Sequence, residues 1–263
     1  MRFQETLYPA WGQNFAQDDI LFEAQTDHQH LVIFENARFG RVMALDGVIQ
    51  TTEHDEFVYH EMMVHVPMLS HANPESVLII GGGDGGILRE VLKHDSVKHV
   101  TQVEIDQGVV DMCVQYFPNH SQGAFDDPRL NLVITDGAAF IDNNTQQFDV
   151  IITDSTDPIR PGEVLFEPSF YAGCARALTS GGILVTQNGV PFMQGDEVTN
   201  TYRRWKPYFQ TRQFYLTPVP TYAGGAMAMG FACKETKAMP SVDVLTDRAD
   251  AIGPLRYYTP AVH

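Results

Sequence analysis

The spacing of apolar and polar positions changes near residue 53. Before that point, short apolar runs alternate with turns that contain Gly40 and Gly47. The runs are LVIF (31–34), RVMALDG (41–47) and VIQTT (48–52). Short β-branched runs bounded by glycine-containing turns are typical of antiparallel strands. The pattern predicts a small N-terminal antiparallel β domain over residues 1–53.

The next segment has helical periodicity. In DEFVYHEMMVHVPML (55–69), Phe57, Met62 and Val66 fall near one face of a helix. The following His-Ala-Asn-Pro run ends that element, because a residue before proline disfavours the helical conformation. We assign residues 54–73 to a connecting helix.

From residue 74 onward, predicted strands alternate with predicted helices. The strands are 77–80, 99–105, 130–135, 148–153, 183–187, 212–217 and 226–232, and the helices are 86–94, 107–116, 168–178 and 196–207. Such alternation is typical of a parallel sheet with helices on both faces. The predicted fold class is α/β, with a doubly wound sheet in residues 74–263.

Acidic residues stand at the ends of four successive predicted strands. They are Asp84, Glu104, Asp136 and Asp154. In a doubly wound sheet, ligands bind at the carboxyl ends of the strands, so four acids at this edge favour a shared acidic pocket. Each acid could instead cap a helix N-terminus, and this alternative stays open for Asp136.

The first of these acids lies inside a glycine loop, GGGDGG (81–86). Glycines let the backbone approach a ligand closely, and Glu104 lies about 20 residues on, where an acid can bind ribose hydroxyls. These two features do not separate dinucleotide sites from adenosyl-sulfonium sites. Asp84 does, because a carboxylate repels a pyrophosphate or the carboxylate of S-adenosylmethionine and attracts an ammonium group. Decarboxylated S-adenosylmethionine offers such a group.

The segment DSTDP (154–158) places two acids three residues apart after a strand. The IRPGEVLFEPSF run that follows contains Pro161 and Pro168, and we predict a long, shaped loop there rather than a helix. Such a loop can cover a site and exclude water. A surface turn with capping acids is the alternative.

Composition and charge narrow the classes of function. The net charge of −16 and the pI of about 4.8 disfavour nucleic-acid or anionic-membrane partners and favour cationic ligands. The three cysteines are far apart, which argues for core packing rather than disulfides or zinc. The histidines lack strong metal spacing, since His60, Glu61 and His65 form HExxxH and not HExxH, so we expect no metal. Without a signal-peptide pattern or an apolar run of ~20 residues, a cytoplasmic protein is expected.

Several stretches together point to one family. They are LDGVIQTTEHDEFVYHEMM (45–63), VLIIGGGDGGILREVLKH (77–94), VEID (103–106), DDPRLNLVITDG (126–137), FDVIITDSTDP (148–158) and PTYAGG (220–225). On these stretches the chain resembles the spermidine synthases, a family of polyamine aminopropyltransferases, over essentially its whole length. The resemblance implies a Rossmann-like, methyltransferase-type domain after the N-terminal β domain.

The same resemblance implies residue roles. Asp154 would be the catalytic proton acceptor, and Asp84 would bind the aminopropyl amine. The remaining implied nucleoside contacts are Gln29, Gly81, Gly82, Gly83, Glu104 (ribose), Asp136 and Gly137 (adenine) and Pro161, and the remaining implied amine contacts are Tyr59, His60, Ser155, Thr156, Asp157 and Tyr222. The implied co-substrate is decarboxylated S-adenosylmethionine, without a prosthetic group. The implied acceptor is putrescine, and the implied assembly is a homodimer or homotetramer.

Two positions depart from the family pattern. Position 60 is histidine where many relatives have glutamine, which bears on the choice or pH dependence of the acceptor, and the chain ends at RYYTPAVH where relatives usually continue into a final helix. Three other functions stay open from the residues alone. They are an S-adenosylmethionine-dependent methyltransferase, an aminopropyltransferase with another di- or polyamine acceptor, and a non-catalytic polyamine-binding protein.

Overall fold

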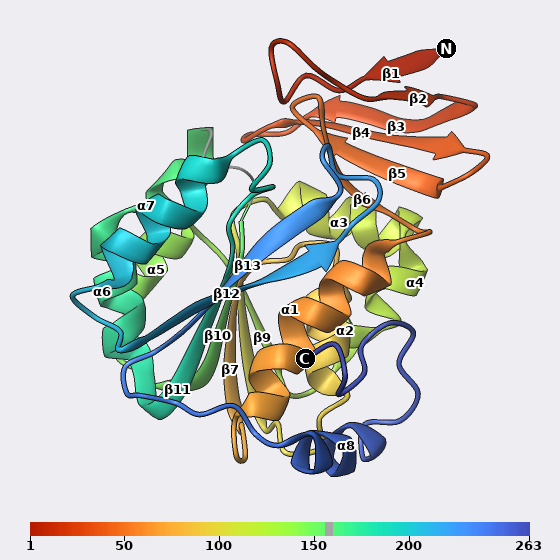
Figure 1. The fold of residues 1–263 in the computed structure, drawn as a ribbon. Helices are drawn as coiled ribbons and strands as arrows, with labels where there is room; N and C mark the ends of the chain where they lie inside the picture. Colours follow the sequence, from red (N-terminus) through yellow and green to blue (C-terminus); the bar gives the residue numbers. More distant parts are fainter. Residues whose placement is uncertain (156–159) are drawn as a thin grey trace.

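The N-terminal part of the chain is antiparallel β structure. The computed structural model describes residues 1–155 and 160–263 (Figure 1). Strands β1 (Arg2–Gln4) and β2 (Asn14–Ala16) pair with each other, and β3 (Asp19–Gln25), β4 (His30–Asn36), β5 (Gly40–Leu45) and β6 (Val48–Thr52) form a four-stranded sheet in chain order. This confirms the antiparallel β unit that the short apolar runs predict.

The four-stranded sheet buries side chains on both faces. Along β4, Leu31 and Ile33 pack in one cluster, whereas Val32 and Phe34 pack in another, as the two-residue period of a strand requires. The first cluster includes Cys113, from helix α3 (Gln107–Tyr116). This explains why the runs here are continuously apolar rather than alternating, and it fixes the small sheet against the rest of the molecule.

The larger sheet has seven strands in the order β12-β13-β11-β10-β7-β8-β9. Their bounds are β7 Ser76–Gly81, β8 His99–Glu104, β9 Leu130–Ile134, β10 Phe148–Asp154, β11 Leu178–Gln187, β12 Thr211–Pro218 and β13 Ala226–Cys233. The chain runs outward from β7 to β9 and then returns to β10 on the other side of β7. The switch point of a doubly wound sheet therefore lies between β7 and β10.

The last two strands correct the prediction of a parallel sheet. Strands β7 to β11 pair in parallel, but β13 is antiparallel to β11, and β12 is antiparallel to β13. Only residues 219–225 join β12 to β13. A connection this short has no crossover helix, so it produces a hairpin.

Helices cover both faces of the large sheet (Figure 1). On one face lie α5 (Gly137–Asn143), α6 (Pro168–Ala177) and α7 (Gly195–Trp205), and on the other lie α1 (Glu56–Ser70), α2 (Gly86–Leu92) and α8 (Val242–Asp250). The short helices α4 (Pro118–Ser121) and η1 (Ala124–Asp126) follow α3. This is the predicted α/β arrangement, and α5 and α8 are helices that the sequence analysis did not assign.

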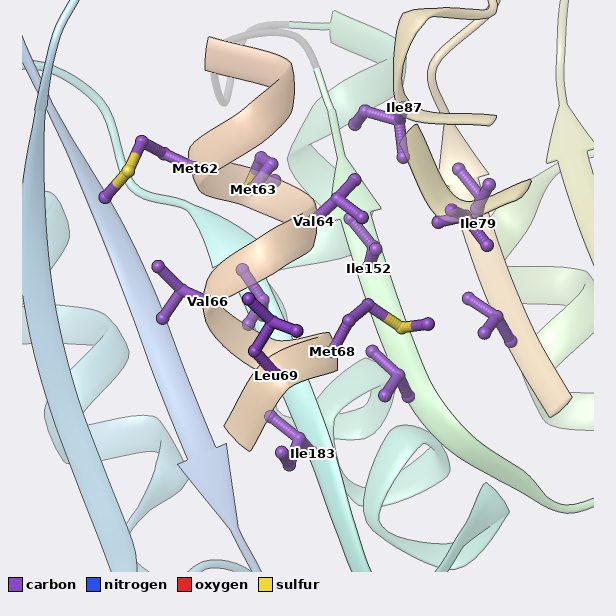
Figure 2. Close-up of a cluster of buried hydrophobic side chains, with 14 of the residues drawn as sticks. Met62, Met63, Val64, Val66, Met68, Leu69, Ile79, Ile87, Ile152 and Ile183 are labelled. Atoms are coloured by element: carbon purple, nitrogen blue, oxygen red, sulfur yellow. The ribbon is translucent and has the colours of Figure 1, made fainter. Parts of the chain in front are cut away.

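Helix α1 lies in the middle of the molecule, with nearly every side chain buried. Figure 2 shows its apolar side chains among others from β7, β10, β11 and α2. The labelled residues are Met62, Met63, Val64, Val66, Met68, Leu69, Ile79, Ile87, Ile152 and Ile183. A helix is confirmed here, although it spans Glu56–Ser70 and not residues 54–73. The single apolar face is wrong, because the sheet, α2 and the C-terminal segment surround α1.

The C-terminal segment folds back onto α1. The Glu61 carboxylate accepts hydrogen bonds from the backbone N–H groups of Arg256, Tyr257 and Tyr258, each at 2.8 Å. The predicted loop after Asp157 is also corrected, because η2 (Arg160–Phe166) is a 3₁₀ helix. Helix α6 begins at Pro168, which confirms the helix predicted over residues 168–178.

All three cysteines are buried as free thiols, which confirms their predicted core packing. Within residues 1–155 and 160–263, none of the helices has the length and apolar character needed to cross a membrane.

Candidate active site

A cavity lies at the carboxyl ends of β7, β8 and β10, where the large sheet meets the N-terminal sheet. The large sheet contributes the glycine loop, Glu104 and Asp154, whereas α1 contributes Tyr59 and His60. The N-terminal part contributes Glu5, Leu7, Tyr8, Gln29 and residues of β5 and β6. The cavity thus forms at the switch point, where ligands bind in folds of this class.

The glycine loop begins in register with Asp154. Gly81 pairs with Asp154 across β7 and β10, and its φ of 86° belongs to the left-handed region. A side chain at Gly81 would collide with the Asp154 carbonyl oxygen, so this close approach requires glycine. The Gln102 side-chain amide donates to the carbonyls of Gly81 and Gly82 at 3.0 and 2.8 Å. Gln102 therefore fixes the shape of the loop from beneath it.

Asp84 is buried and contacts a histidine. Its Oδ2 lies 3.3 Å from His60 Nε2, and His60 Nδ1 lies 2.6 Å from Glu56 Oε2. Burial alone would lower the pKa of His60, but Asp84 and Glu56 raise it to about 10. Burial would likewise raise the pKa of Asp84 and of Glu56, yet His60 holds the former well below its usual range and the latter at about 2. The group is therefore a protonated histidine between two carboxylates.

Asp154 is paired with a tyrosine. The Tyr59 hydroxyl donates to Asp154 Oδ1 at 2.5 Å. Burial raises the pKa of Asp154 to about 6, although the Tyr59 hydrogen bond works in the opposite direction. Tyr222 lies edge-on to Tyr59, with ring centroids 5.9 Å apart, and its hydroxyl donates to the Gln50 carbonyl at 2.7 Å. The carboxyl is thus more basic than an exposed aspartate and is held by the Tyr59 hydroxyl.

Glu104 and Gln29 lie in another part of the cavity wall. Glu104 Oε1 accepts from the backbone N–H groups of Ile105 and Asp106 at 2.8 and 3.0 Å. Burial nevertheless raises the pKa of Glu104 to about 7. Gln29 donates to the Asp106 carboxylate at 3.1 Å, which orients its amide beside the cavity.

Asp136 has both of the roles that the sequence left open. It is the N-cap of α5, and its Oδ1 accepts from the Ala139 N–H at 2.8 Å. Asp136 and Gly137 also line the cavity. A side chain at Gly137 would collide with Ile80, so the start of α5 packs closely on β7.

The structure brings most of the predicted site residues together. Those that line the cavity are Gln29, Tyr59, His60, Gly81, Gly82, Gly83, Asp84, Glu104, Asp136, Gly137, Asp154, Ser155 and Tyr222. Pro161 lies in η2, whose Gly162 and Leu165 line the cavity. Thr156 and Asp157 lie outside the described residues.

Sequence reasoning missed several residues around the cavity. Glu5 is buried and lines the cavity, and its Oε1 accepts from the Ile49 N–H at 3.1 Å. Gln102 could have been noticed as a polar residue in the middle of a predicted buried strand. Asp55 Oδ2 accepts from the Thr221 N–H and hydroxyl at 3.0 and 2.8 Å, which fixes the segment next to Tyr222.

These groups suit a cationic ligand and a proton transfer. Asp84 is ionised, whereas Asp154 and Glu104 have raised pKa values, so one wall of the cavity accepts positive charge and another accepts a proton. Across the described ranges, no group of three or more His, Cys, Asp or Glu residues is arranged to hold a metal ion.

Two family models match the chain. The spermine/spermidine synthase domain matches residues 56–244, and the spermidine synthase tetramerisation domain matches residues 1–53. Together they cover almost all of the chain.

Curated proteins and solved structures agree with these matches. Polyamine aminopropyltransferase 1 of Pseudomonas aeruginosa is 59% identical over 263 residues, which cover 99% of this chain and 92% of that protein. A polyamine aminopropyltransferase of Pseudomonas syringae pv. tomato is 58% identical over 264 residues, with the same coverage of each.

Among solved structures, a spermidine synthase in complex with the transition-state analogue AdoDATO has a TM-score of 0.94 and 39% identity, and the match covers 100% of this chain and 90% of that one. The spermidine synthase from Thermotoga maritima has a TM-score of 0.90 and 38% identity, covering 100% and 89%.

Proposed function

The chain belongs to the spermine/spermidine synthase family and is a polyamine aminopropyltransferase, and we propose that it transfers the aminopropyl group of decarboxylated S-adenosylmethionine to putrescine. The products are spermidine and methylthioadenosine. The main support is the position of Asp154. Its carboxyl has a raised pKa, and the residue is paired with Gly81 of the glycine loop across β10 and β7.

The co-substrate occupies the glycine-loop side of the cavity in this proposal. Glu104 binds the ribose hydroxyls, while Asp136 and Gly137 lie against the adenine. Gln29 and η2 cover the nucleoside from the other side. Asp84 binds the aminopropyl ammonium, since it is an ionised carboxylate in the middle of the loop. A related spermidine synthase has been solved in complex with the transition-state analogue AdoDATO, which supports a ligand of this kind.

The amine acceptor occupies the side lined by Tyr59 and Tyr222. Their rings provide flat apolar walls for methylene groups and favourable faces for ammonium ends. Glu5, which enters the cavity from the N-terminal segment, places a carboxyl on this part of the wall. The proposed acceptor is therefore a short diamine, and the sequence favours putrescine.

Asp154 is the general base in the proposed mechanism. Alkyl amines have pKa values near ~10.4, so the attacking nitrogen must lose a proton before it has a lone pair. The positive charge of the sulfonium lowers the pKa of that ammonium, while burial makes Asp154 a stronger base than an exposed aspartate. Because Tyr59 donates to Oδ1, we assign the proton to Oδ2.

Bond making and bond breaking occur in line. The freed nitrogen attacks the methylene carbon next to the sulfonium, forming a carbon–nitrogen bond. The carbon–sulfur bond breaks, and its electron pair returns to sulfur. The leaving group is neutral methylthioadenosine, so the main task of the site is to position two cations together within acidic walls.

A methyltransferase of the same fold is the alternative. Intact S-adenosylmethionine would place its carboxylate near Asp84, which is ionised, and the two charges would repel each other. Chromatographic product analysis separates the two functions, because aminopropyl transfer forms methylthioadenosine and methyl transfer forms S-adenosylhomocysteine.

The proposed function is tested by replacing the base. We expect Asp154→Asn to lower kcat by about 10²–10⁴-fold, the usual range for loss of a general base, with nucleoside binding retained in calorimetry. Asp149→Asn is the matched control. Asp149 lies on the same strand but accepts from the backbone N–H groups of Glu75 and Ser76, away from the cavity. Near-normal turnover of Asp154→Asn would remove Asp154 as the base.

The acceptor is tested separately. A mass-spectrometric screen with decarboxylated S-adenosylmethionine would compare putrescine, cadaverine, diaminopropane and spermidine. We expect the highest kcat/KM with putrescine. A higher value with any of the others would replace it as the acceptor and leave the transfer reaction unchanged.

The assembly is also a proposal. The match of residues 1–53 to a tetramerisation domain supports an oligomer, and we propose a homodimer or homotetramer. The division into a β domain (1–53), a connecting helix (54–73) and a catalytic domain (74–263) belongs to the same proposal. Sedimentation analysis distinguishes the two oligomers.

A further inference from the structure

The His60 ring is held by carboxylates on both of its nitrogen atoms. Nδ1 lies 2.6 Å from Glu56 Oε2, and Nε2 lies 3.3 Å from Asp84 Oδ2. An ionised carboxylate can only accept hydrogen bonds, so both ring nitrogens have to be protonated when both contacts are made. The side chain is nearly fully buried, at 3% exposure for the residue. The contact of a carboxylate with each ring nitrogen therefore favours the imidazolium form of His60 in the protein without ligand.

The ring has no room to move away from these partners. It packs against the backbone of Gly86, where a Cβ atom would collide with the imidazole. The Asp84 carboxylate is also fixed, because its Oδ1 accepts from the Gly86 N–H at 2.9 Å. Asp84 and His60 are therefore a preformed ion pair that lies against Gly86, the first residue of α2.

Other titratable or charged groups surround the pair. They are Tyr59 of α1, His120 of α4 with its ring 6.1 Å from His60, Arg89 of α2 with its guanidinium 2.9 Å from the Glu56 carboxylate, and Asp154 of β10, which Tyr59 contacts. Burial lowers the pKa of His120, so this neighbour is neutral and adds no positive charge. The positive charge nearest to Asp84 is that of His60.

The ligand of the proposed function brings two further positive charges, a sulfonium and an ammonium. The ammonium is the group assigned to Asp84, so it competes with His60 for the same carboxylate. We propose that binding of the aminopropyl ammonium to Asp84 displaces a proton from His60, so that co-substrate binding releases a proton to solvent. This inference rests on the proposed function.

The proton balance is simple. The Nε2–H bond of His60 breaks, and the proton goes to the buffer. The Nδ1–H bond stays and continues to donate to Glu56. The lone pair left on Nε2 faces the incoming ammonium and can accept a hydrogen bond from it, so a repulsive neighbour becomes an acceptor.

The pKa of His60 falls on binding because the ring loses one favourable partner and gains a neighbour of like charge. Asp84 and Glu56 together raise the pKa of His60 to about 10, against the effect of burial. An ammonium that pairs with Asp84 neutralises the charge of that carboxylate and repels the imidazolium. Burial then favours the neutral ring.

The proposal predicts a difference between two related nucleosides. Decarboxylated S-adenosylmethionine has the ammonium, whereas methylthioadenosine lacks the whole aminopropyl group. Between about pH 6 and pH 8, affinity for the former should rise roughly tenfold per pH unit, because binding releases about one proton. Ionisation of Glu104, whose pKa is about 7, affects both nucleosides alike because both carry the ribose, so the ratio of the two affinities should carry the tenfold dependence.

Isothermal titration calorimetry of the full chain tests this directly. Each nucleoside is titrated at one pH in phosphate and in Tris, whose ionisation enthalpies differ. We expect the apparent enthalpy of decarboxylated S-adenosylmethionine to shift between buffers by more than that of methylthioadenosine, and the excess should be the heat of about one proton. Equal enthalpies in both buffers, or an equal shift for both nucleosides, would overturn the proposal. No binding of decarboxylated S-adenosylmethionine at all would instead overturn the proposed function.

Two variants assign the proton to a residue. His60→Gln should abolish the excess shift, whereas His71→Gln, at the exposed end of α1, should keep it. Retention of the full excess in His60→Gln would contradict the assignment. If His60→Gln does not fold, side-chain ¹⁵N spectra of histidine-labelled wild-type protein give the same answer. Nε2 of one buried histidine should change from protonated to unprotonated when the co-substrate is added, and an unchanged imidazolium signal would contradict the proposal.

Discussion

Two buried histidine–carboxylate clusters lie side by side on helices α1 and α2, and only one of them reaches the cavity. The pocket cluster consists of Glu56, His60 and Asp84, and the core cluster consists of His65, Glu90 and His94. Arg89 joins the two, since its guanidinium contacts Glu56 at 2.9 Å and Glu90 at 2.7 Å. The two clusters share residue types, burial and a cation, so their differences show what makes a site.

The partners of each histidine differ. His60 lies between two carboxylates, whereas His65 lies between Glu90 at 2.9 Å and the His94 ring at 3.0 Å. Burial, and then the neighbouring His65, lowers the pKa of His94 to about 3, so the core cluster includes a neutral ring. Tyr258 of the C-terminal segment also packs on His65, with ring centroids 5.7 Å apart. The core cluster is closed by protein, and the pocket cluster ends at a cavity.

The largest expected effect concerns the pocket cluster. Asp84→Asn should lower kcat/KM for the co-substrate by about 3–4 kcal/mol, roughly 10²–10³-fold, because a buried ammonium loses its charged partner. Steady-state kinetics with decarboxylated S-adenosylmethionine measure the effect. The melting temperature should change little, since His60 keeps Glu56. A near-normal kcat/KM would contradict the division between the clusters.

The matched change in the core cluster should affect stability instead. Glu90→Gln removes the carboxylate that Arg89, His65 and Lys93 share, at a cost of about 3 kcal/mol in the free energy of unfolding. Denaturant unfolding measures the loss, and kcat/KM of the folded fraction should remain within about twofold of wild type. A large loss of activity at unchanged stability would show that the core cluster takes part in the reaction.

Arg89 belongs to both clusters, so its replacement should produce both effects at smaller size. Arg89→Lys cannot reproduce the planar fork that also donates to the His120 carbonyl at 2.7 Å. We expect a loss of about 2 kcal/mol in stability and a several-fold loss of kcat/KM. An effect on only one of the two measurements would mean that the clusters are independent.

The smallest expected effect has the opposite sign. The folded-state pKa of Asp154 is raised to about 6. Ionising this carboxyl therefore destabilises the fold as the pH rises from the pKa of Asp154 in the unfolded chain through 6. Asp154→Asn should therefore be about 1–2 kcal/mol more stable than wild type at pH 8, and the difference should disappear near pH 4. The pKa of Glu56 is lowered to about 2, so its ionised form stabilises the fold. This contribution to the free energy of unfolding is lost as the pH falls from the unfolded-state pKa of Glu56 through 2. Unfolding curves at the two pH values check the signs. Equal stability of Asp154→Asn and wild type at both pH values would contradict the raised pKa.

Sequence reasoning predicted the shared edge of the cavity well. Glu104, Asp136 and Asp154 come together with the glycine loop because parallel strands present their carboxyl ends on one side, whatever their side chains contact. This part of the site depends on topology alone. It therefore follows from the order of strands and helices along the chain.

The rest depends on contacts between distant segments. Gln102, Glu5 and the core cluster acquire their roles only when separate elements pack together, and periodicity contains no information on such pairs. The single apolar face predicted for α1 failed for the same reason, since its other sides are covered by the C-terminal segment.

Some errors came from local signals that were misjudged. Proline in the run after Asp157 was interpreted as a loop marker, although proline is well tolerated in the first turn of a helix, and Pro161 is the second residue of the 3₁₀ helix η2. Helix α8 had an N-cap serine, Ser241, and a basic residue in its last turn, Arg248. Both are ordinary boundary signals that could have identified the helix.

The pairing of Gly81 with Asp154 has a consequence for how the site responds to temperature and strain. Gly81 of the loop assigned to the electrophile is directly paired with Asp154, assigned as the base, across two neighbouring strands of one ladder, so thermal motion displaces them together. Thermal adaptation of this enzyme can then alter the surrounding helices and loops while the reacting geometry is inherited unchanged from the sheet.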